Sequence, residues 1–436
     1  MQAQALARTL PADRQAEGRP ALGLPTRRCG LGALLAATAR RHPARPLLTD
    51  LGDKPGWCGR PAMGWSYGAA AEIVNRLARG IRAWRLPPGS RVGLWFPGGS
   101  EGLVAHLAVE AAGHVPCPMP AAWDEARLLA GIEAAGIRAV LTQGRLGARR
   151  PAEILCRVAL GCFALRYLAA FGPDVPDGVI NLDAMALERG APDPAPEGGG
   201  GLVSFAGRDP LCPVLRPGDA LLAAVAAHLV AARIGPAERL VTLLPPDDLR
   251  GLVTGLGAAL VAGASLETMP VFDRTALARA LAPEPAGRSP HLVAPAFLEG
   301  PLADFLPGHG RPASLTLVHR APAKLTGRRL DLGARSGARI VDALVLGEAA
   351  VVSRARGADD IALALADPEA ARFPAGLLEL RRDAEGGLCL RGQAALPAAE
   401  GTREVGRAPQ PEAELWRPAP YRIPLFAGTA TAVLEA

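Results

Sequence analysis

The sequence predicts an α/β protein with two doubly wound, mostly parallel sheets packed with helices, followed by a small β-rich subdomain. Short apolar runs bounded by turn residues alternate with amphipathic segments of about a dozen residues, the pattern of parallel strands joined by crossover helices. A Pro- and Gly-rich segment, 191–201, divides this alternation into two halves. With 436 residues, 49% hydrophobic and 21% charged, the chain can bury two or three cores, which excludes a mainly disordered protein.

In the first half, Ile73, Leu77, Ile81 and Trp84 recur at helical spacing, so a helix is expected there. The apolar run 92–96 between Arg91 and Pro97 predicts a buried strand. The elements expected next are a helix over 101–112, a strand near residue 115, a helix from 124 and a strand over 139–142.

In the second half, the expected elements are helices over 219–232, over 251–262 and near residues 275 and 296, and strands over 240–244, around 266, near 292, over 315–318 and over 339–346. From Phe373 onward the pattern changes to short strands, 377–380 and 388–391, separated by turns. The expected division is therefore a loose leader (1–30), a first α/β subdomain (31–200), a second (201–370) and a small β-rich subdomain (371–436).

Charge and cysteine usage exclude several classes of protein. The formal net charge is +6, but arginine is scattered and aromatic residues make up only 4%, so no nucleic-acid-binding strip is expected. The seven cysteines are odd in number and form no C-x-x-C pair, which disfavours a disulfide framework or a zinc site. The uncharged run 251–266 is shorter than the roughly 20 residues of a membrane span, and charged residues precede any apolar run, so a cytoplasmic protein is expected.

Residues 98–102 read G-x-S-x-G between a predicted strand and a predicted helix, the context of a nucleophile elbow. The alternative is that Ser100 caps the helix and Glu101 lies favourably in its first turn. The histidines show no i, i+4 pair and none adjoins clustered acids at metal-ligand spacing, so a histidine metal site is not expected. A serine hydrolase using Ser100 stays as a lesser alternative.

A third candidate follows the glycine-rich segment, where a predicted strand runs into a loop with Ser204, Gly207 and Arg208. Backbone N–H groups can cradle an anion where small residues leave room. One glycine and one arginine make a poor cradle, and no Gly-Lys-Ser/Thr motif is present. Spacing alone therefore gives a weak signal.

Longer stretches resemble a known family. The runs 64–78 (GWSYGAAAEIVNRLA) and 86–97 (LPPGSRVGLWFP) are similar to the opening of AMP-forming acyl-CoA synthetases, adenylation domains and luciferases, the adenylate-forming superfamily. The stretches 106–116, 242–245, 256–264 and 387–392 resemble later family segments in the right order. The resemblance spans roughly residues 33 to 425. It implies the N-terminal core of these enzymes, and because the chain stops at Ala436 the C-terminal lid domain is expected to be absent.

The resemblance also implies a chemistry, in which an adenylyl group moves from ATP to a carboxylate and the acyl group then passes to a thiol. Where the family has a hydroxyl-rich loop ending in Pro-Lys-Gly, this chain has 205–213 (FAGRDPLCP), and an aromatic and a histidine are replaced by Asp247 and Asp248. The Tyr-Gly-x-Thr-Glu motif appears as 344–348 (LVLGE), which keeps only Glu348, and the ribose aspartate is lost near 416–420. Without the lid's lysine, the developing phosphate charge lacks its stabilising cation.

The resemblance therefore implies a degenerate member of the family with no catalytic residues. Vestigial nucleotide-binding positions are Ser204, Gly207, Arg208 and Glu348, the last also a vestigial Mg²⁺ ligand, and the candidate pocket-lining positions are Asp247, Asp248, Arg320, Ala321 and Leu344. No cofactor is assigned, and ATP with Mg²⁺ would be required if activity is retained.

The expected role is binding of an acyl or carboxylate ligand or of a partner protein. The partner classes are an acyl carrier protein, an acyl-transferring enzyme or an active paralogue. Since carrier proteins are usually acidic, an arginine-rich chain could attract one electrostatically. The alternative is a working AMP-forming ligase that receives its lid from another polypeptide. The sequence fixes neither the native ligand nor the oligomeric state.

Overall fold

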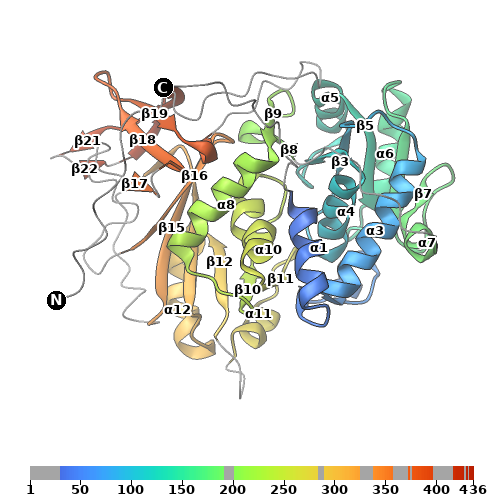
Figure 1. Ribbon diagram of the computed structural model, residues 1–436, viewed down its shortest axis with the longest axis horizontal. Helices are drawn as coiled ribbons and strands as arrows, with labels where there is room; N and C mark the ends of the chain where they lie inside the picture. The colour runs from blue at the N-terminus through green and yellow to red at the C-terminus, as the bar shows by residue number, and fades with distance from the viewer. Residues whose placement is uncertain are drawn as a thin grey trace, which may run out of the picture.

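The computed structural model describes residues 30–190, 201–282, 289–324, 337–356, 372–373, 376–395, 416–426, 429–430 and 432–436. Two mostly parallel sheets alternate with three layers of helices, and a small antiparallel sheet lies at one end (Figure 1). This arrangement confirms the predicted fold class. Within the described residues, no helix is both long and apolar enough to cross a membrane.

The larger sheet has the strand order β16-β15-β13-β12-β10-β11-β1-β2, in which the inner strands are parallel and the two edge strands antiparallel. Its side chains alternate between two cores, as the period of a strand requires: Leu292 and Ala294 face one side and Val293 the other. The strands are β1 (Pro46–Asp50), β2 (Gly64–Ser66), β10 (Arg239–Thr242), β11 (Ser265–Thr268), β12 (His291–Pro295), β13 (Ser314–Arg320), β15 (Arg339–Leu346) and β16 (Ala350–Ala355).

The smaller sheet is parallel throughout, with the order β4-β3-β5-β6-β7. Its strands are β3 (Arg91–Leu94), β4 (Val115–Pro118), β5 (Ile137–Gln143), β6 (Tyr167–Phe171) and β7 (Ile180–Asn181). The helices α5 (Glu125–Ala135) and α6 (Pro151–Leu160) cover its outer face, and α7 (Leu182–Leu187) follows its last strand. The hairpin β8 (Gly201–Phe205) and β9 (Pro213–Pro217) packs beside it, with Val203 and Phe205 in the same core.

The largest core lies between the two sheets and contains the central helices. These are α1 (Leu31–Arg41), α3 (Tyr67–Ala83), α4 (Ser100–Ala111), α8 (Gly218–Ala232) and α10 (Ala258–Ala262). Helix α4 is buried on all sides from Ser100 to Val109, as expected of a helix enclosed between layers. The helices α11 (Arg274–Leu281) and α12 (Glu299–His309) cover the outer face of the larger sheet.

The C-terminal part forms a small antiparallel sheet with the order β14-β23-β20-β19-β18-β17. Its strands are β14 (Ala323–Lys324), β17 (Arg372–Phe373), β18 (Leu378–Arg382), β19 (Gly387–Arg391), β20 (Arg417–Arg422) and β23 (Ala432–Glu435), and β21 (Leu425–Phe426) pairs separately with β22 (Thr429–Ala430). The sequence predicted this β-rich texture from Phe373 onward. Of the expected leader 1–30, only Gly30 lies within the described residues, and of the expected linker 191–201 only Gly201, the first residue of β8, does.

Two features differ from the sequence-based expectation. A clean division at residue 200 is not observed, because β1 and β2 join the larger sheet, where Leu48 pairs with Leu266 of β11. The helix expected over 251–262 is a short helix α9 (Leu249–Gly251), a π-helical segment (Leu252–Gly257) and α10. Glycine is required at the start of this segment, since a Cβ on Gly251 would lie 1.9 Å from the carbonyl oxygen of Pro245.

Candidate functional site

Most of the sequence-predicted site residues gather at one edge of the larger sheet. Strands β10, β13 and β15 are parallel, so their carboxyl ends meet at the same edge, where ligands of open α/β sheets bind. Arg320 is the last residue of β13, Glu348 follows β15 in a tight turn, and Asp247 and Asp248 lie between β10 and α9. The β8–β9 hairpin brings Ser204 to the same place.

Glu348 is held by two hydrogen-bond donors from different elements. Its Oε2 accepts a hydrogen bond of 2.5 Å from Ser204 Oγ and one of 3.1 Å from the backbone N–H of Leu249. The side chain is only 4% exposed. Burial, followed by the negative charge of Asp248, raises the pKa of Glu348 to about 8. The carboxyl group is therefore mostly protonated at neutral pH.

A buried arginine holds the turn that carries Glu348 through hydrogen bonds to its backbone. Arg216 of β9 is 1% exposed and donates hydrogen bonds to the carbonyl oxygens of Glu348 (2.5 Å), Ala349 (2.7 Å) and Ala394 (3.1 Å). Burial lowers the pKa of Arg216 to about 10, so the guanidinium stays charged at neutral pH. Arg216 thus ties the hairpin, the larger sheet and the C-terminal part together.

Asp247 and Arg208 form an ion pair across the site. One guanidinium nitrogen of Arg208, Nη2, lies 2.9 and 3.1 Å from the two carboxylate oxygens of Asp247. Arg208 adopts a left-handed backbone conformation after Gly207, with φ near 62° at both residues, which turns its side chain back toward the sheet. Burial and the neighbouring Asp248 raise the pKa of Asp247 to about 6.

Asp248 is shared between two further arginines and a helix end. Its Oδ2 lies 2.6 Å from Nη2 of Arg250 and 2.9 Å from Nη2 of Arg320. Its Oδ1 accepts hydrogen bonds from the backbone N–H groups of Arg250 and Gly251, which caps α9. Asp248 is 1% exposed, so its charge is balanced within the protein.

The remaining predicted positions lie in different surroundings. Gly207 is at the turn of the hairpin loop, where its positive φ suits glycine. Ala321 is buried directly after Arg320, whereas Leu344 is fully buried inside β15, in the core between the sheets. Leu344 is therefore placed for packing.

Sequence reasoning missed Arg216 and Arg250. In the sequence both look like ordinary surface positions. Arg216 is a charged residue in the short segment 213–217 (PVLRP), and Arg250 precedes a glycine-rich segment. Only long-range contacts reveal their role in fixing the site.

An open hollow of about 570 Å³ lies on the outer side of Gly207 and Arg208, whereas the cavities beside Asp247 and Pro246 are small. The cavity lined in part by Phe96, His106 and Asp247, and a second one lined by Thr242, Pro246 and neighbouring residues, have volumes of about 10 Å³ each. Such a volume holds about one water molecule. Neither cavity could accept an acyl chain without rearrangement of its walls.

The fit of Mg²⁺ to this site is poor. A magnesium ion prefers charged carboxylate oxygens in an octahedral set, whereas Glu348 is mostly protonated and already accepts two hydrogen bonds. Among the described residues, no group of three or more His, Cys, Asp or Glu side chains is arranged to hold a metal ion. The carboxylates of Asp247 and Asp248 are paired with arginines of the same site. The described residues of the site therefore do not fit a magnesium ion.

Ser100, the other sequence candidate, lies in a separate buried network. Its Oγ donates a hydrogen bond of 2.7 Å to Asp50 and lies 3.2 Å from Nζ of Lys54, which in turn contacts Asp50 (2.5 Å) and Glu101 (2.7 Å). The expectation that Ser100 caps α4 is wrong, because the cap position is Gly99 and the N–H of Ser100 donates to Asp50 of β1. Ser100 is 1% exposed.

Comparisons with known proteins agree with this fold. Residues 35–168 match the family model described as AMP-binding enzyme. A salicyl-AMP ligase / salicyl-S-ArCP synthetase of Mycobacterium tuberculosis is 37% identical over 106 residues, a match that covers 24% of this chain and only 18% of that relative.

Solved structures show the same fold at low sequence identity. A benzoate CoA ligase from Burkholderia xenovorans LB400 superposes with a TM-score of 0.69 and 15% identity, covering 94% of this chain and 80% of that one. The N-terminal domain of FACL13 from Mycobacterium tuberculosis gives 0.62 and 15%, covering 94% and 100%.

Proposed function

The chain belongs to the adenylate-forming superfamily, and from this premise we propose that it is an acyl-CoA-ligase-like protein that does not adenylate and instead binds a partner protein. The observation that carries the proposal is the pairing of Asp247 and Asp248 with Arg208, Arg250 and Arg320. By the family resemblance, these carboxylates lie in a region that would adjoin anionic substrates.

Electrostatics argues against a triphosphate at this edge. A phosphate would have to separate Arg208 from Asp247 and then lie beside two carboxylates, of which Asp248 is paired with Arg250 and Arg320. Two like charges 4 Å apart repel by about 4 kcal/mol at the effective dielectric constant of a protein surface. The only cation that the loop after β8 supplies to attract a phosphate is the half-exposed Arg208.

The small cavities favour a partner protein over a small ligand in the remnant pocket. Cavities of about 10 Å³ beside Asp247 and Pro246 give an acyl chain no room. The relative from Mycobacterium tuberculosis is named as a salicyl-S-ArCP synthetase, which supports an acyl carrier protein as the partner class. Such a role would be carried out in the cytoplasm.

The test is a calorimetric titration of the protein with ATP and Mg²⁺, paired with ATP–pyrophosphate exchange over a pool of fatty and aromatic acids. An active adenylate-forming ligase run in parallel validates both assays. We expect neither heat of binding nor exchange, in the original chain or in Glu348→Gln. Exchange that Glu348→Gln abolishes would refute the proposal and favour a ligase whose lid is supplied by another polypeptide.

A further inference from the structure

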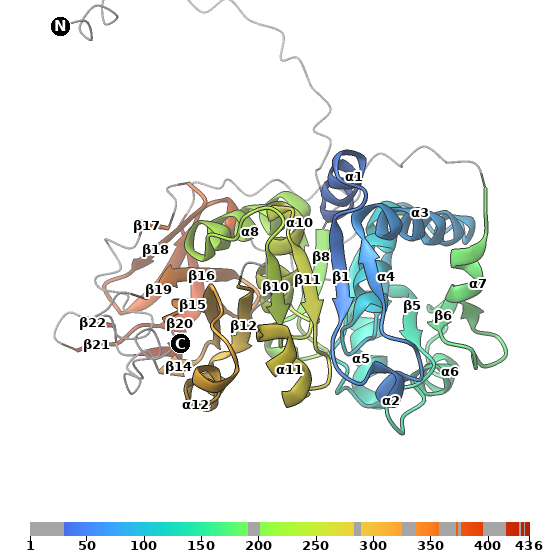
Figure 2. The same cartoon turned by 90° about the horizontal axis from the view of Figure 1, so that it is seen from below.

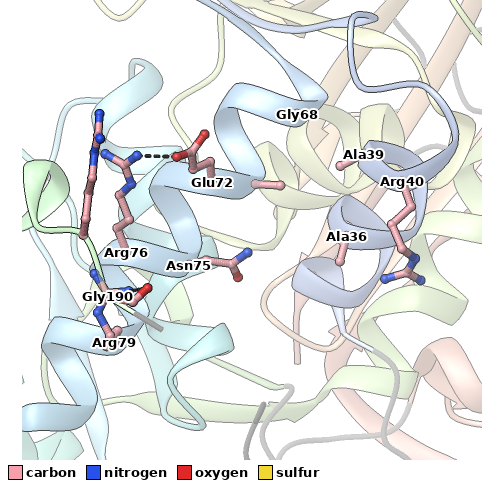
Figure 3. Close-up of a pocket in the computed structure, with 11 residues that line it drawn as sticks. Ala36, Ala39, Arg40, Gly68, Glu72, Asn75, Arg76, Arg79 and Gly190 are labelled. Carbon is pink, nitrogen blue, oxygen red and sulfur yellow. Dashed lines mark hydrogen bonds and ion pairs between the residues drawn. The ribbon is translucent and has the colours of Figure 1, made fainter. Parts of the chain in front are cut away.

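A groove lined by arginines lies between two helices of the central layer. It has a volume of about 730 Å³ and is open to solvent. Figure 3 shows Asn75, Arg76 and Arg79 of α3 on one side and Ala36, Ala39 and Arg40 of α1 on the other. In Figure 2, α1 and α3 lie at the border of the molecule opposite α2 (Lys54–Cys58), which follows the carboxyl end of β1. The groove shares no lining residue with the candidate site. Its lining is Ala36, Ala39, Arg40, Gly68, Ala71, Glu72, Asn75, Arg76, Arg79, Arg189 and Gly190.

Among the residues that the structure describes, the positive charge of this arginine groove is only partly balanced by acidic partners. Of its four arginines, Arg76 pairs with Glu72, the one acidic residue in the lining. Arg79 donates to the backbone carbonyls of Glu188 (2.6 Å) and Gly190 (3.2 Å), which fix its position, and it forms no ion pair with a described residue. Arg40 and Arg189 are exposed and form no ion pair with any residue that the structure describes.

The other lining residues restrict what can bind. The uncharged lining residues are glycines, alanines and Asn75, and no aromatic or large aliphatic side chain of a described residue lines the groove. A lipid would find no apolar anchor there, and a nucleic-acid base would find no stacking partner. The backbone N–H of Gly68 already donates to Pro43, so the first turn of α3 is not free to hold a single phosphate.

We propose that this groove is the docking surface for an acidic segment of a partner protein, which presents several separate carboxylates to the arginines of α1, α3 and the segment 189–190. Guanidinium groups bind carboxylates through paired, charge-assisted hydrogen bonds, and here they are distributed around a groove instead of converging on one point. The inference deepens the partner-binding part of the proposed function and specifies where the partner docks.

The experiment measures fluorescence anisotropy of a fluorescein-labelled deca-glutamate peptide with the full chain at low salt. A deca-glutamine peptide and a single-stranded DNA of equal length serve as comparison probes. The test variant is Arg40→Glu with Arg189→Glu, two exposed side chains without ion pairs among the described residues. The matched control is Arg41→Glu with Arg150→Glu, which changes the net charge equally at exposed positions outside the lining.

We expect the glutamate peptide to bind, the glutamine peptide not to bind, and Arg40→Glu/Arg189→Glu to weaken binding at least tenfold while the control changes it less than threefold. Circular dichroism should show all variants folded. Absence of peptide binding, equal losses in both variants, or tighter binding of DNA through the same two arginines would overturn the proposal. Because ATP is not involved, these results are independent of the nucleotide titration, and either proposal can fail alone.

Discussion

Ser204 and Glu348, 144 residues apart in the chain, share a buried hydrogen bond of 2.5 Å between Oγ and Oε2. The hydroxyl comes from the β8–β9 hairpin and the carboxyl from the turn after β15, so this contact joins the hairpin to the edge of the larger sheet. The hydrogen bonds of Glu348 therefore link the hairpin, the larger sheet and the start of α9.

The protein should lose stability as Glu348 is forced to ionise. In the unfolded chain its pKa is near 4.5, and in the folded protein it is about 8. Between these values the unfolded state has released a proton that the folded state keeps, so the free energy of unfolding falls as pH rises, and it falls no further above pH 8. The variant Glu348→Gln lacks this dependence, so its stability relative to the original chain should increase from pH 5 to 8.

Urea denaturation at several pH values measures this difference. Glu133→Gln, at an exposed position of α5, is the matched control and should track the original chain at every pH. Parallel curves for Glu348→Gln and the original chain would show that the carboxyl is not buried as described.

Lys54 should be among the most costly side chains to remove. It is fully buried between Asp50 and Glu101, and replacement by methionine leaves the buried carboxylate of Asp50 without its cation, while Glu101 keeps only Arg60. We expect Lys54→Met to lower the free energy of unfolding by about 3–5 kcal/mol. Lys324 is the only other lysine in the sequence and is exposed, so Lys324→Met should stay within about 0.5 kcal/mol of the original chain in the same denaturation experiment.

Ser100 should not react with a fluorophosphonate probe. Its hydroxyl is buried and donates to the carboxylate of Asp50, and its hydrogen-bonding partners among the described residues include no histidine to act as a base. Ser100→Ala should instead reduce stability by about 1–3 kcal/mol, because Asp50 and Lys54 lose a partner. Labelling of the original chain that disappears in Ser100→Ala would revive the hydrolase alternative.

Local sequence patterns predicted most of the fold because the evidence for a buried parallel strand is itself local. The run around Val92 and the helix over 219–232 appear as β3 and α8 with ends shifted by one or two residues. The pairing of β1 with β11 could not be predicted in this way, since the paired residues Leu48 and Leu266 are separated in sequence by about half of the chain. Long-range pairing leaves no periodic trace in either segment.

The candidate site was predicted in part. The family resemblance gave Ser204, Arg208 and Glu348, which the structure brings to one edge of the sheet. It could not give Arg216, whose partners are backbone carbonyls and hence invisible in any side-chain pattern. The G-x-S-x-G motif suggested Ser100 as the cap of α4, which was wrong, because the N–H of Ser100 donates to the carboxylate of Asp50, from a strand fifty residues earlier.

The burial of Lys54 gives the chain an internal reporter. Asp50 belongs to the larger sheet, while Ser100 and Glu101 begin the helix that follows the first strand of the smaller one, so Lys54 lies at the seam between the two sheets. An amine-reactive reagent should modify Lys324 in the native protein and reach Lys54 only when the seam opens. The ratio of the two modified peptides in a mass spectrum would then measure how often the two halves separate, without any engineered label.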